Sequence, residues 1–247
     1  MDTVHVVAFN GSPRRHGNTV TLMNWVLEGC QGAGCDSEWI HIADCKIRYC
    51  QGCFTCLREG SCPIDDDFQA VRSKLLEAQG IIIGSPVYGD APTAQLKTFL
   101  DRLCLLNLFV YLFKDHHSVG VATSGVAPTG GVARSLAILF GQPSGFIGAT
   151  TSSRARGYQN LGEYHKKNLP GKARALGRRL VMDIRSPRRF NLPLREILMH
   201  RCLSQAVLRP MVTSNPEQFA GVMSLWEENG WSQIISTRKN RLKGLSG

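Results

Sequence analysis

The chain has 247 residues, of which 43% are hydrophobic and 19% charged, and this composition indicates a globular protein with a sizeable core rather than a disordered one. Its longest apolar runs, such as residues 103–113, are interrupted by polar residues and fall short of the roughly 20 residues that a membrane span needs. The net charge of +10 would suit nucleic-acid binding, but the basic residues are not interleaved with aromatic ones and no named nucleic-acid motif is present, which argues against that partner.

Short apolar runs alternate with segments of helical periodicity through the first 150 residues. Residues 3–9 (TVHVVAF) are typical of a buried parallel strand, because the run is apolar and β-branched and a turn follows it directly. The other expected strands are residues 37–42, 80–85, 118–123 and 145–150, and the expected helices are residues 18–28, 66–78, 93–105 and 131–140. This alternation predicts an α/β fold, a flavodoxin-like doubly wound five-stranded parallel sheet that binds ligands at the carboxyl ends of its strands.

The alternation weakens from about Thr151. Residues 161–184 are expected to form a long basic helix that closes the sheet, and residues 216–228 a short helix in a basic tail. Up to residue 150 there are 11 Lys and Arg against 13 Asp and Glu, whereas beyond it there are 18 against 6. We expect a flavodoxin-like domain over residues 1–185 and a mainly helical, basic C-terminal extension over residues 186–247, whose charges face solvent or an acidic electron-transfer partner.

A polar loop, GSPRRHGNT, follows the first expected strand at residues 11–19. Two glycines allow tight turns, and the side chains of Ser12, Arg14, Asn18 and Thr19 can donate hydrogen bonds beside the amino end of a helix, which together make an anion site. Neither the dinucleotide fingerprint G-x-G-x-x-G nor the phosphate loop G-x-x-x-x-G-K-[ST] is present, which disfavours NAD-type and ATP-type binding here. A plain polar turn capped by Asn18 is the alternative interpretation.

Two further loops follow the third and fourth expected strands and should line the same crevice. Their candidate residues are Pro86, Val87, Tyr88 and Gly89 in the first loop, and Thr123, Ser124 and Gly125 in the second. A flat ring could lie between them, with backbone N–H groups meeting its heteroatoms and Tyr88 beside it. Tyr88 could equally be a packed surface aromatic residue.

Nine cysteines are present, and several of them cluster. Cys50, Cys53, Cys56 and Cys62 have the spacing C-x2-C-x2-C-x5-C, and Pro63 follows the last. Thiols at every third residue of a compact loop can bind one side of an iron–sulfur cubane, and a fourth thiolate completes the set, much as in the bacterial ferredoxin run that also ends in Cys-Pro. Structural zinc sites usually use two distant cysteine pairs, so the spacing disfavours zinc and leaves free or redox-active thiols as the main alternative.

Two other features of the cysteine loop, which spans residues 45–65, have simpler interpretations. Cys45 is outside the matched spacing, and we interpret it as a neighbour rather than a ligand. Asp65, Asp66 and Asp67 precede an expected helix, so we interpret them as a cap and negative charge at the helix start rather than as a metal site.

The segments GSPRRHGNT, SPVYGD and AQLKTFLDR resemble, in the same order, the NADPH-dependent FMN reductase branch of the flavodoxin-like superfamily over roughly residues 3–150. The resemblance implies that Ser12, Arg14, Asn18 and Thr19 hold the phosphate of FMN, and that residues 86–89 and 123–125 surround the isoalloxazine ring. It also implies a homodimer or a dimer of dimers, with subunit contacts near the flavin. The basic tail after about residue 186 has no clear counterpart in the short members.

The cysteine motif is similar to that of the iron-sulfur flavoproteins, a subgroup of the same family with a [4Fe-4S] cluster next to the flavin. FMN can accept two electrons together and release them singly, whereas a cluster passes one at a time. We therefore expect an electron-transfer flavoprotein or oxidoreductase that passes electrons between a ferredoxin-like or NAD(P)H donor and a small-molecule acceptor. No side chain is assigned as a general acid or base, because the cofactors carry the chemistry.

Two other functions stay open at this point. The first is a cluster-free NAD(P)H-dependent FMN or quinone reductase, in which hydride passes to N5 of the flavin and then to a small acceptor. The second is a redox-sensing or binding module whose basic tail docks on nucleic acid or an acidic protein. The N-terminus has no signal-peptide pattern, so we expect the cytoplasm in each case.

Overall fold

A computed structural model describes residues 3–153, 157–158, 168–186 and 207–228. The chain divides into two compact units. Unit 1 consists of Met1–Tyr49, Asp65–Asp101 and Leu112–Leu192, and unit 2 consists of Cys50–Ile64, Arg102–Tyr111 and Pro193–Gly247. The boundary that the sequence predicts at residue 185 stays a prediction, because residues 187–206 lie outside the described ranges. No helix in the described part of the chain is long and apolar enough to cross a membrane.

Unit 1 contains a sheet of five strands. The strands are β1 (Val4–Asn10), β2 (Cys35–His41), β3 (Gly80–Pro86), β4 (His117–Ser124) and β5 (Gln142–Thr150). Their order is β2-β1-β3-β4-β5, and every neighbouring pair is parallel. This is the order of the flavodoxin fold, so the expected fold is confirmed.

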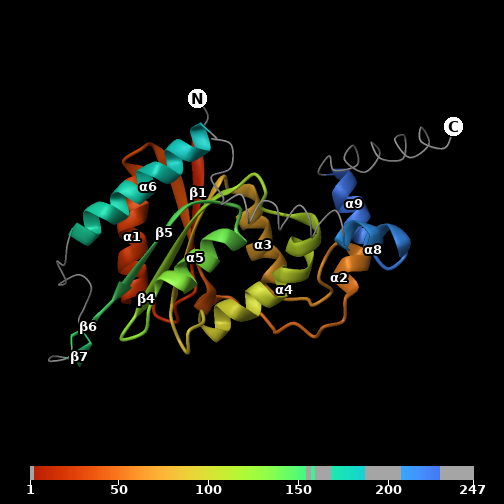
Figure 1. The fold of residues 1–247 in the computed structure, drawn as a ribbon, viewed down its shortest axis with the longest axis horizontal. Helices are drawn as coiled ribbons and strands as arrows, with labels where there is room; N and C mark the ends of the chain where they lie inside the picture. The colour runs from red at the N-terminus through yellow and green to blue at the C-terminus, as the bar shows by residue number, and fades with distance from the viewer. Residues whose placement is uncertain (1–2, 154–156, 159–167, 187–206, 229–247) are drawn as a thin grey trace. The chain divides into compact units, whose positions relative to one another are not determined.

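Helices cover both faces of this sheet, which is why the central strands are apolar on both sides. Figure 1 shows α1 (Asn18–Gln31) and α6 (Leu169–Arg185) on one face, and α3 (Phe68–Glu77), α5 (Gly130–Leu139) and the start of α4 (Ala94–Val110) on the other. The shorter elements are the 3-10 helix η1 (Ile42–Asp44) and the strand pair β6 (Ser152–Ser153) and β7 (Gly157–Tyr158). The helix expected over residues 161–184 corresponds to α6, while residues 161–167 lie outside the described ranges.

The two faces of the sheet have different cores. Leu22 and Met23 of α1 pack with Leu180 of α6 against β1 and β4. On the other face aromatic rings dominate, and the ring centroids of Phe9 and Phe99 lie 5.1 Å apart in an edge-to-face arrangement. These buried side chains hold the strands in register, so the carboxyl ends of β1, β3 and β4 stay together at one edge.

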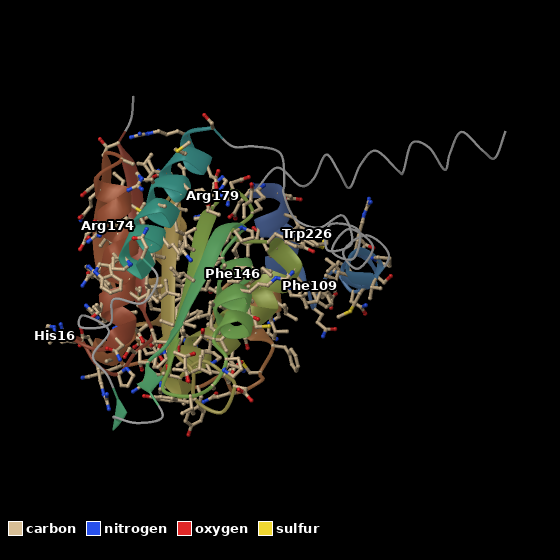
Figure 2. All side chains as sticks on the ribbon, turned by 60° about the vertical axis from the view of Figure 1, so that its left-hand side comes forward. His16, Phe109, Phe146, Arg174, Arg179 and Trp226 are labelled. Atoms are coloured by element: carbon tan, nitrogen blue, oxygen red, sulfur yellow. The ribbon has the colours of Figure 1, made fainter. Side chains whose placement is uncertain are left out.

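Unit 2 is built on helices. Its described elements are α2 (Thr55–Glu59), the end of α4, α8 (Arg209–Ser214) and α9 (Ala220–Glu228). The indole N–H of Trp226 donates to the carbonyl oxygen of Phe109 at 2.8 Å, and Figure 2 shows the two side chains close together. The helix expected over residues 216–228 is therefore present as α9 but begins later, while α2 within the cysteine loop was not expected.

Burial disfavours the charged form of two adjacent histidines, His116 directly before β4 and His117 at its first residue. Nε2 of His116 lies 3.1 Å from the carbonyl oxygen of Leu76, so this nitrogen carries the hydrogen and donates it. Nδ1 of His116 is buried and has no hydrogen-bond partner among the described residues. Burial lowers the pKa of both His116 and His117, because it removes water from the imidazolium form.

These lowered pKa values give a pH dependence. The unfolded chain binds more protons than the native chain as the pH falls through about 6.5, so the free energy of unfolding should decrease there as acid is added. Urea denaturation at pH 7.5, 6.5 and 5.5 measures this slope. The variant His116→Gln keeps a donor for Leu76 but cannot titrate, and it should show a shallower slope; an equally steep slope would contradict the assignment.

Candidate functional site

Three loops leave the carboxyl edge of the sheet in unit 1. They follow β1, β3 and β4, and in a doubly wound sheet this edge is where ligands bind. Figure 2 shows His16 of the first loop at the amino end of α1. Hydrogen bonds join the three loops to one another, so their polar groups form a single connected site.

The first loop is fixed by a buried asparagine that sequence reasoning missed. Oδ1 of Asn10 accepts the N–H of Ser12 at 2.9 Å, and its Nδ2 lies 3.0 Å from Nδ1 of His41. Burial is the main cause that lowers the pKa of His41, followed by the nearby charge of Arg15. Asn10 could have been found as a polar residue that ends an apolar strand directly before a glycine.

Ser12 and Arg14 occupy different environments in this loop. Oγ of the buried Ser12 accepts the N–H of Arg14 at 3.1 Å, and a hydroxyl that accepts one bond still has its own hydrogen to donate. The Arg14 side chain is exposed, and no described carboxylate forms an ion pair with it. Arg15, by contrast, forms an ion pair with Asp44.

The amino end of α1 has features that are typical of an anion site. Gly17 occupies the cap position, so no side chain caps the first turn, and the first turn has no acidic residue. The first N–H groups of a helix point along its axis without intrahelical partners, and the helix dipole adds partial positive charge there. Asn18 and Thr19 begin this helix, so both lie where an anion would sit.

Thr19 and Thr123, both predicted as site residues, are in direct contact. Their hydroxyl oxygens lie 2.6 Å apart and both side chains are buried. Only one of the two hydroxyls can donate in this pair, so the other keeps its hydrogen for another acceptor. The N–H of Val87 donates to the carbonyl oxygen of Thr123 at 2.8 Å. The structure thus brings together residues from all three predicted loops.

A second connection runs through Thr93, which sequence reasoning also missed. Its hydroxyl donates to the carbonyl oxygen of Gly11 at 2.6 Å and accepts the N–H of Leu96 at 3.3 Å, and its own N–H donates to Oγ of Ser85 at 3.0 Å. Thr93 therefore caps α4 and ties the first loop to the second. The signal that could have found it is a threonine at the very start of an expected helix.

The second loop contains a tight turn that exposes an aromatic ring. Tyr88 and Ala91 exchange backbone hydrogen bonds, and the residues between them, Gly89 and Asp90, have φ values of 56° and 58°. A pair of positive φ values is the conformation of a type I′ turn, in which glycine is favoured. The Tyr88 side chain is 55% exposed. Pro86 ends β3 and Val87 begins the loop.

The third loop is folded around Ser124. Its Oγ accepts the N–H groups of Val126 at 3.1 Å and Ala127 at 2.8 Å, so its hydroxyl fixes the turn and the backbone of Gly125 with it. Val126 is 82% exposed at the tip of the loop. Chemically, the three loops offer hydroxyl and N–H donors for an anion, together with backbone and apolar groups for a flat ring.

The predicted cysteine ligands all lie in unit 2. Cys50 and Cys53 are exposed, and Cys56 and Cys62 are half-buried. The pKa of Cys56 is raised first by burial and then by the charges that Cys62, Cys50 and Cys53 would carry as thiolates. Cys56 is therefore within electrostatic reach of the other three cysteines, and four thiolates are the donor chemistry that an iron–sulfur cluster requires.

The backbone of the cysteine loop follows a tight course. Phe54 has a φ of 57°, a left-handed conformation that costs a phenylalanine about 1 kcal/mol, and α2 begins directly after it. Among the described residues, no group of three or more His, Cys, Asp or Glu side chains is arranged so that it could hold a metal ion.

Helix α2 is held by α9 at a glycine–glycine contact. A Cβ atom on Gly221 would lie 2.0 Å from the backbone nitrogen of Gly60, so only glycine fits there. Gly60 ends α2 with a φ of 71°. The C-terminal helix thus packs directly on the helix that carries Cys56.

The neighbouring polar residues of unit 1 have structural partners. Asp66 accepts the N–H groups of Arg48 and Phe68, and Asp67 accepts that of Lys46, so these carboxylates order the turn before α3. The thiol of Cys45 donates to the carbonyl oxygen of His41 at 3.4 Å. Asp67 occupies the cap position of α3, but its side chain makes no capping hydrogen bond to the helix, so the aspartates have structural partners other than the expected cap contact.

The sequence and the fold of this chain are similar to those of known reductases. The family model described as NADPH-dependent FMN reductase matches residues 4–154. An iron-sulfur flavoprotein of Methanocaldococcus jannaschii is 40% identical over 127 residues, which are 51% of this chain and 64% of that relative. The chain therefore covers less than two thirds of the length of this relative.

A second relative matches over most of both chains. An iron-sulfur flavoprotein of Clostridioides difficile is 23% identical over 228 residues, which are 91% of this chain and 98% of that protein. Among solved structures, a flavone reductase aligns with a TM-score of 0.56 at 14% identity over 77% of this chain and 66% of that one. This structural likeness shows the shared fold.

Thr93 gives a test of how the loops are held together. Thr93→Val keeps the side-chain shape but leaves the Gly11 carbonyl and the Leu96 N–H without their hydroxyl partner, so we expect the free energy of unfolding to fall by about 1–3 kcal/mol. Urea denaturation without added ligand measures the change. The control Thr93→Ser keeps the hydroxyl and should lose much less; equal losses in the two variants would disprove the role of the hydroxyl.

Proposed function

Since this chain belongs to the NADPH-dependent FMN reductase family, we propose that it is an FMN-dependent oxidoreductase that also carries a [4Fe-4S] cluster on its cysteine loop. The observation that supports the flavin most directly is the anion site at the amino end of α1, where no side chain caps the helix. The observation that supports the cluster is that all four predicted cysteine ligands lie in unit 2, with Cys56 within electrostatic reach of the other three.

The phosphate of FMN would sit on the first N–H groups of α1. In this proposal the Ser12 hydroxyl and the Asn18 and Thr19 side chains donate to its oxygens, and Arg14 adds a charge-assisted contact. Ser12 is already oriented by the hydrogen bond from the Arg14 N–H. A site prepared in this way needs little rearrangement to bind the dianion.

The isoalloxazine ring would lie against the loops after β3 and β4. Residues 86–89 and Thr123, Ser124 and Gly125 would line it, and their backbone is fixed by the bond from Val87 to Thr123 and by the turn around Ser124. When bound, FMN supplies the exchange between two-electron and one-electron chemistry. The residues of the chain bind the ring, orient it and limit its contact with water.

Cys50, Cys53, Cys56 and Cys62 would hold the cluster as thiolate ligands. Half-buried Cys56 and Cys62 would form its protein-facing side, and exposed Cys50 and Cys53 its accessible side. The names of the two iron-sulfur flavoprotein relatives support this assignment. We propose a ferredoxin-like or NAD(P)H donor and a small-molecule acceptor as the electron-transfer partners.

Exposed apolar side chains beside the flavin site suggest a homo-oligomer. Tyr88 and Val126 are both largely exposed, at 55% and 82%, and both belong to the loops that would surround the ring. A second copy of the chain could cover them in a dimer or tetramer. We propose that this assembly works in the cytoplasm.

Arg14 and Arg15 provide a matched pair for testing the phosphate site. Arg14→Gln should weaken FMN binding about tenfold, because a charge-assisted hydrogen bond contributes roughly 1.5 kcal/mol or more. Arg15→Gln should change it much less, since Arg15 is paired with Asp44. Fluorescence titration of the apoprotein measures both dissociation constants.

Riboflavin, which lacks the phosphate, serves as the control ligand in this titration. It should bind to the wild type and to Arg14→Gln with the same affinity. If Arg14→Gln weakened the binding of riboflavin as much as that of FMN, the phosphate assignment would be wrong.

The cysteine loop is tested by the double variant Cys53→Ala/Cys56→Ala. After anaerobic purification it should lose iron, sulfide and the brown absorbance of the cluster, yet retain yellow FMN. Cys45→Ala is the control, because the Cys45 thiol is bonded to the His41 carbonyl oxygen, and it should retain full iron content. Unchanged iron in the double variant would refute the cluster assignment.

A cluster-free NAD(P)H-dependent FMN or quinone reductase is the alternative function. It is favoured by the family match, whose description names NADPH and FMN but no cluster. A wild-type chain that is free of iron after anaerobic purification and still reduces FMN with NADPH would establish it.

A further inference from the structure

We propose that Arg102 tunes the [4Fe-4S] cluster, raising its reduction potential through a hydrogen bond to the sulfur of Cys62; this inference rests on the proposed function. Arg102 belongs to unit 2, as Cys62 does. It is a positioning and tuning residue, since it would act on the cluster through one of the cysteine ligands.

The contact itself is specific. Nη2 of Arg102 lies 3.3 Å from Sγ of Cys62 and 3.3 Å from the carbonyl oxygen of Ile64. The Ile64 carbonyl fixes the orientation of the guanidinium group, so the nitrogen is held against the sulfur. A guanidinium group can make both contacts because its N–H donors lie in one plane, and it keeps its positive charge at every pH of interest.

Because Arg102 is buried, its positive charge acts on the Cys62 sulfur with little screening by solvent. Only 3% of the residue is exposed, although arginine is almost never fully buried without a compensating interaction. A charge in this environment is screened little by water or salt. Arg102 lies in α4, within the segment FLDRLCLL, where an arginine among apolar residues is itself a signal that the position has a specific task.

Arg58 provides the internal comparison. It lies on α2 between Cys56 and Cys62 in the sequence, so it too is a positive charge close to the cysteines. Its side chain is 60% exposed and is paired with Oε1 of Glu59 at 3.3 Å. Its influence on a cluster should therefore be small and should decrease with salt.

The physical effect follows from the charge of the cluster. Net charge and hydrogen bonds to the sulfurs are among the factors that set the potential of an iron–sulfur cluster. Reduction adds one negative charge, so a fixed cation at a ligand sulfur stabilises the reduced form more than the oxidised form. Loss of this cation and its N–H donor should lower the potential.

The experiment is an anaerobic redox titration of the holoprotein, with the cluster and the FMN followed separately by electron paramagnetic resonance and absorbance. In Arg102→Gln the ratio of reduced to oxidised cluster at a fixed ambient potential should fall about tenfold, which is a shift of about 59 mV for a one-electron couple. The shift should persist at 0.5 M salt. Arg58→Gln should give a much smaller shift that disappears in salt.

The outcomes separate this inference from the proposed function. A wild-type chain that takes up no iron overturns the proposed function. A loaded chain with the same cluster potential in the wild type and in Arg102→Gln, or with equal salt-sensitive shifts in both variants, overturns only the tuning role.

A second variant covers the case in which Arg102→Gln takes up no iron. Arg102→Lys keeps the positive charge but loses the planar guanidinium group. This variant should bind the cluster, and the reduction potential of the cluster should fall by less than the shift of about 59 mV expected for Arg102→Gln. An unchanged potential in Arg102→Lys would then count against the inference.

Discussion

The hydrogen bond between Thr19 and Thr123 is the constraint on which the candidate flavin site depends. It joins the first turn of α1 to the end of β4, two segments that are distant in the sequence, at a place where both hydroxyls are buried. Thr123 also accepts the N–H of Val87, so the same residue fixes the loop after β3. One hydroxyl pair therefore joins the loop proposed to hold the phosphate to the loop proposed to line the ring.

Much of unit 1 could be predicted because its signals are local. An apolar β-branched run followed by a polar, glycine-containing turn indicates a strand and the loop after it, and Thr19, Val87 and Thr123 could be placed at one edge from topology alone. Topology does not say which of these residues contact each other. That Thr19 bonds to Thr123 depends on packing between segments that no sequence pattern connects.

The residues that were missed share a physical reason. Asn10, Thr93 and Arg102 are polar residues inside or beside apolar segments, and they bond to backbone atoms or to a sulfur rather than to a partner with a recognisable spacing. Their importance comes from burial, which makes an unsatisfied polar group costly. The helix α2 was missed because its five residues are too few to show a periodicity.

The contact between Gly60 and Gly221 has a consequence for biosynthesis. Helix α9 can pack on α2 only after the ribosome has made it. At 5–20 residues per second, this is roughly ten to thirty seconds after α2 has been synthesised. Until then the cysteines of the nascent chain lack the surface that α9 provides. The cluster of the proposed function would therefore be assembled on a cysteine loop that gains the support of α9 only late in synthesis.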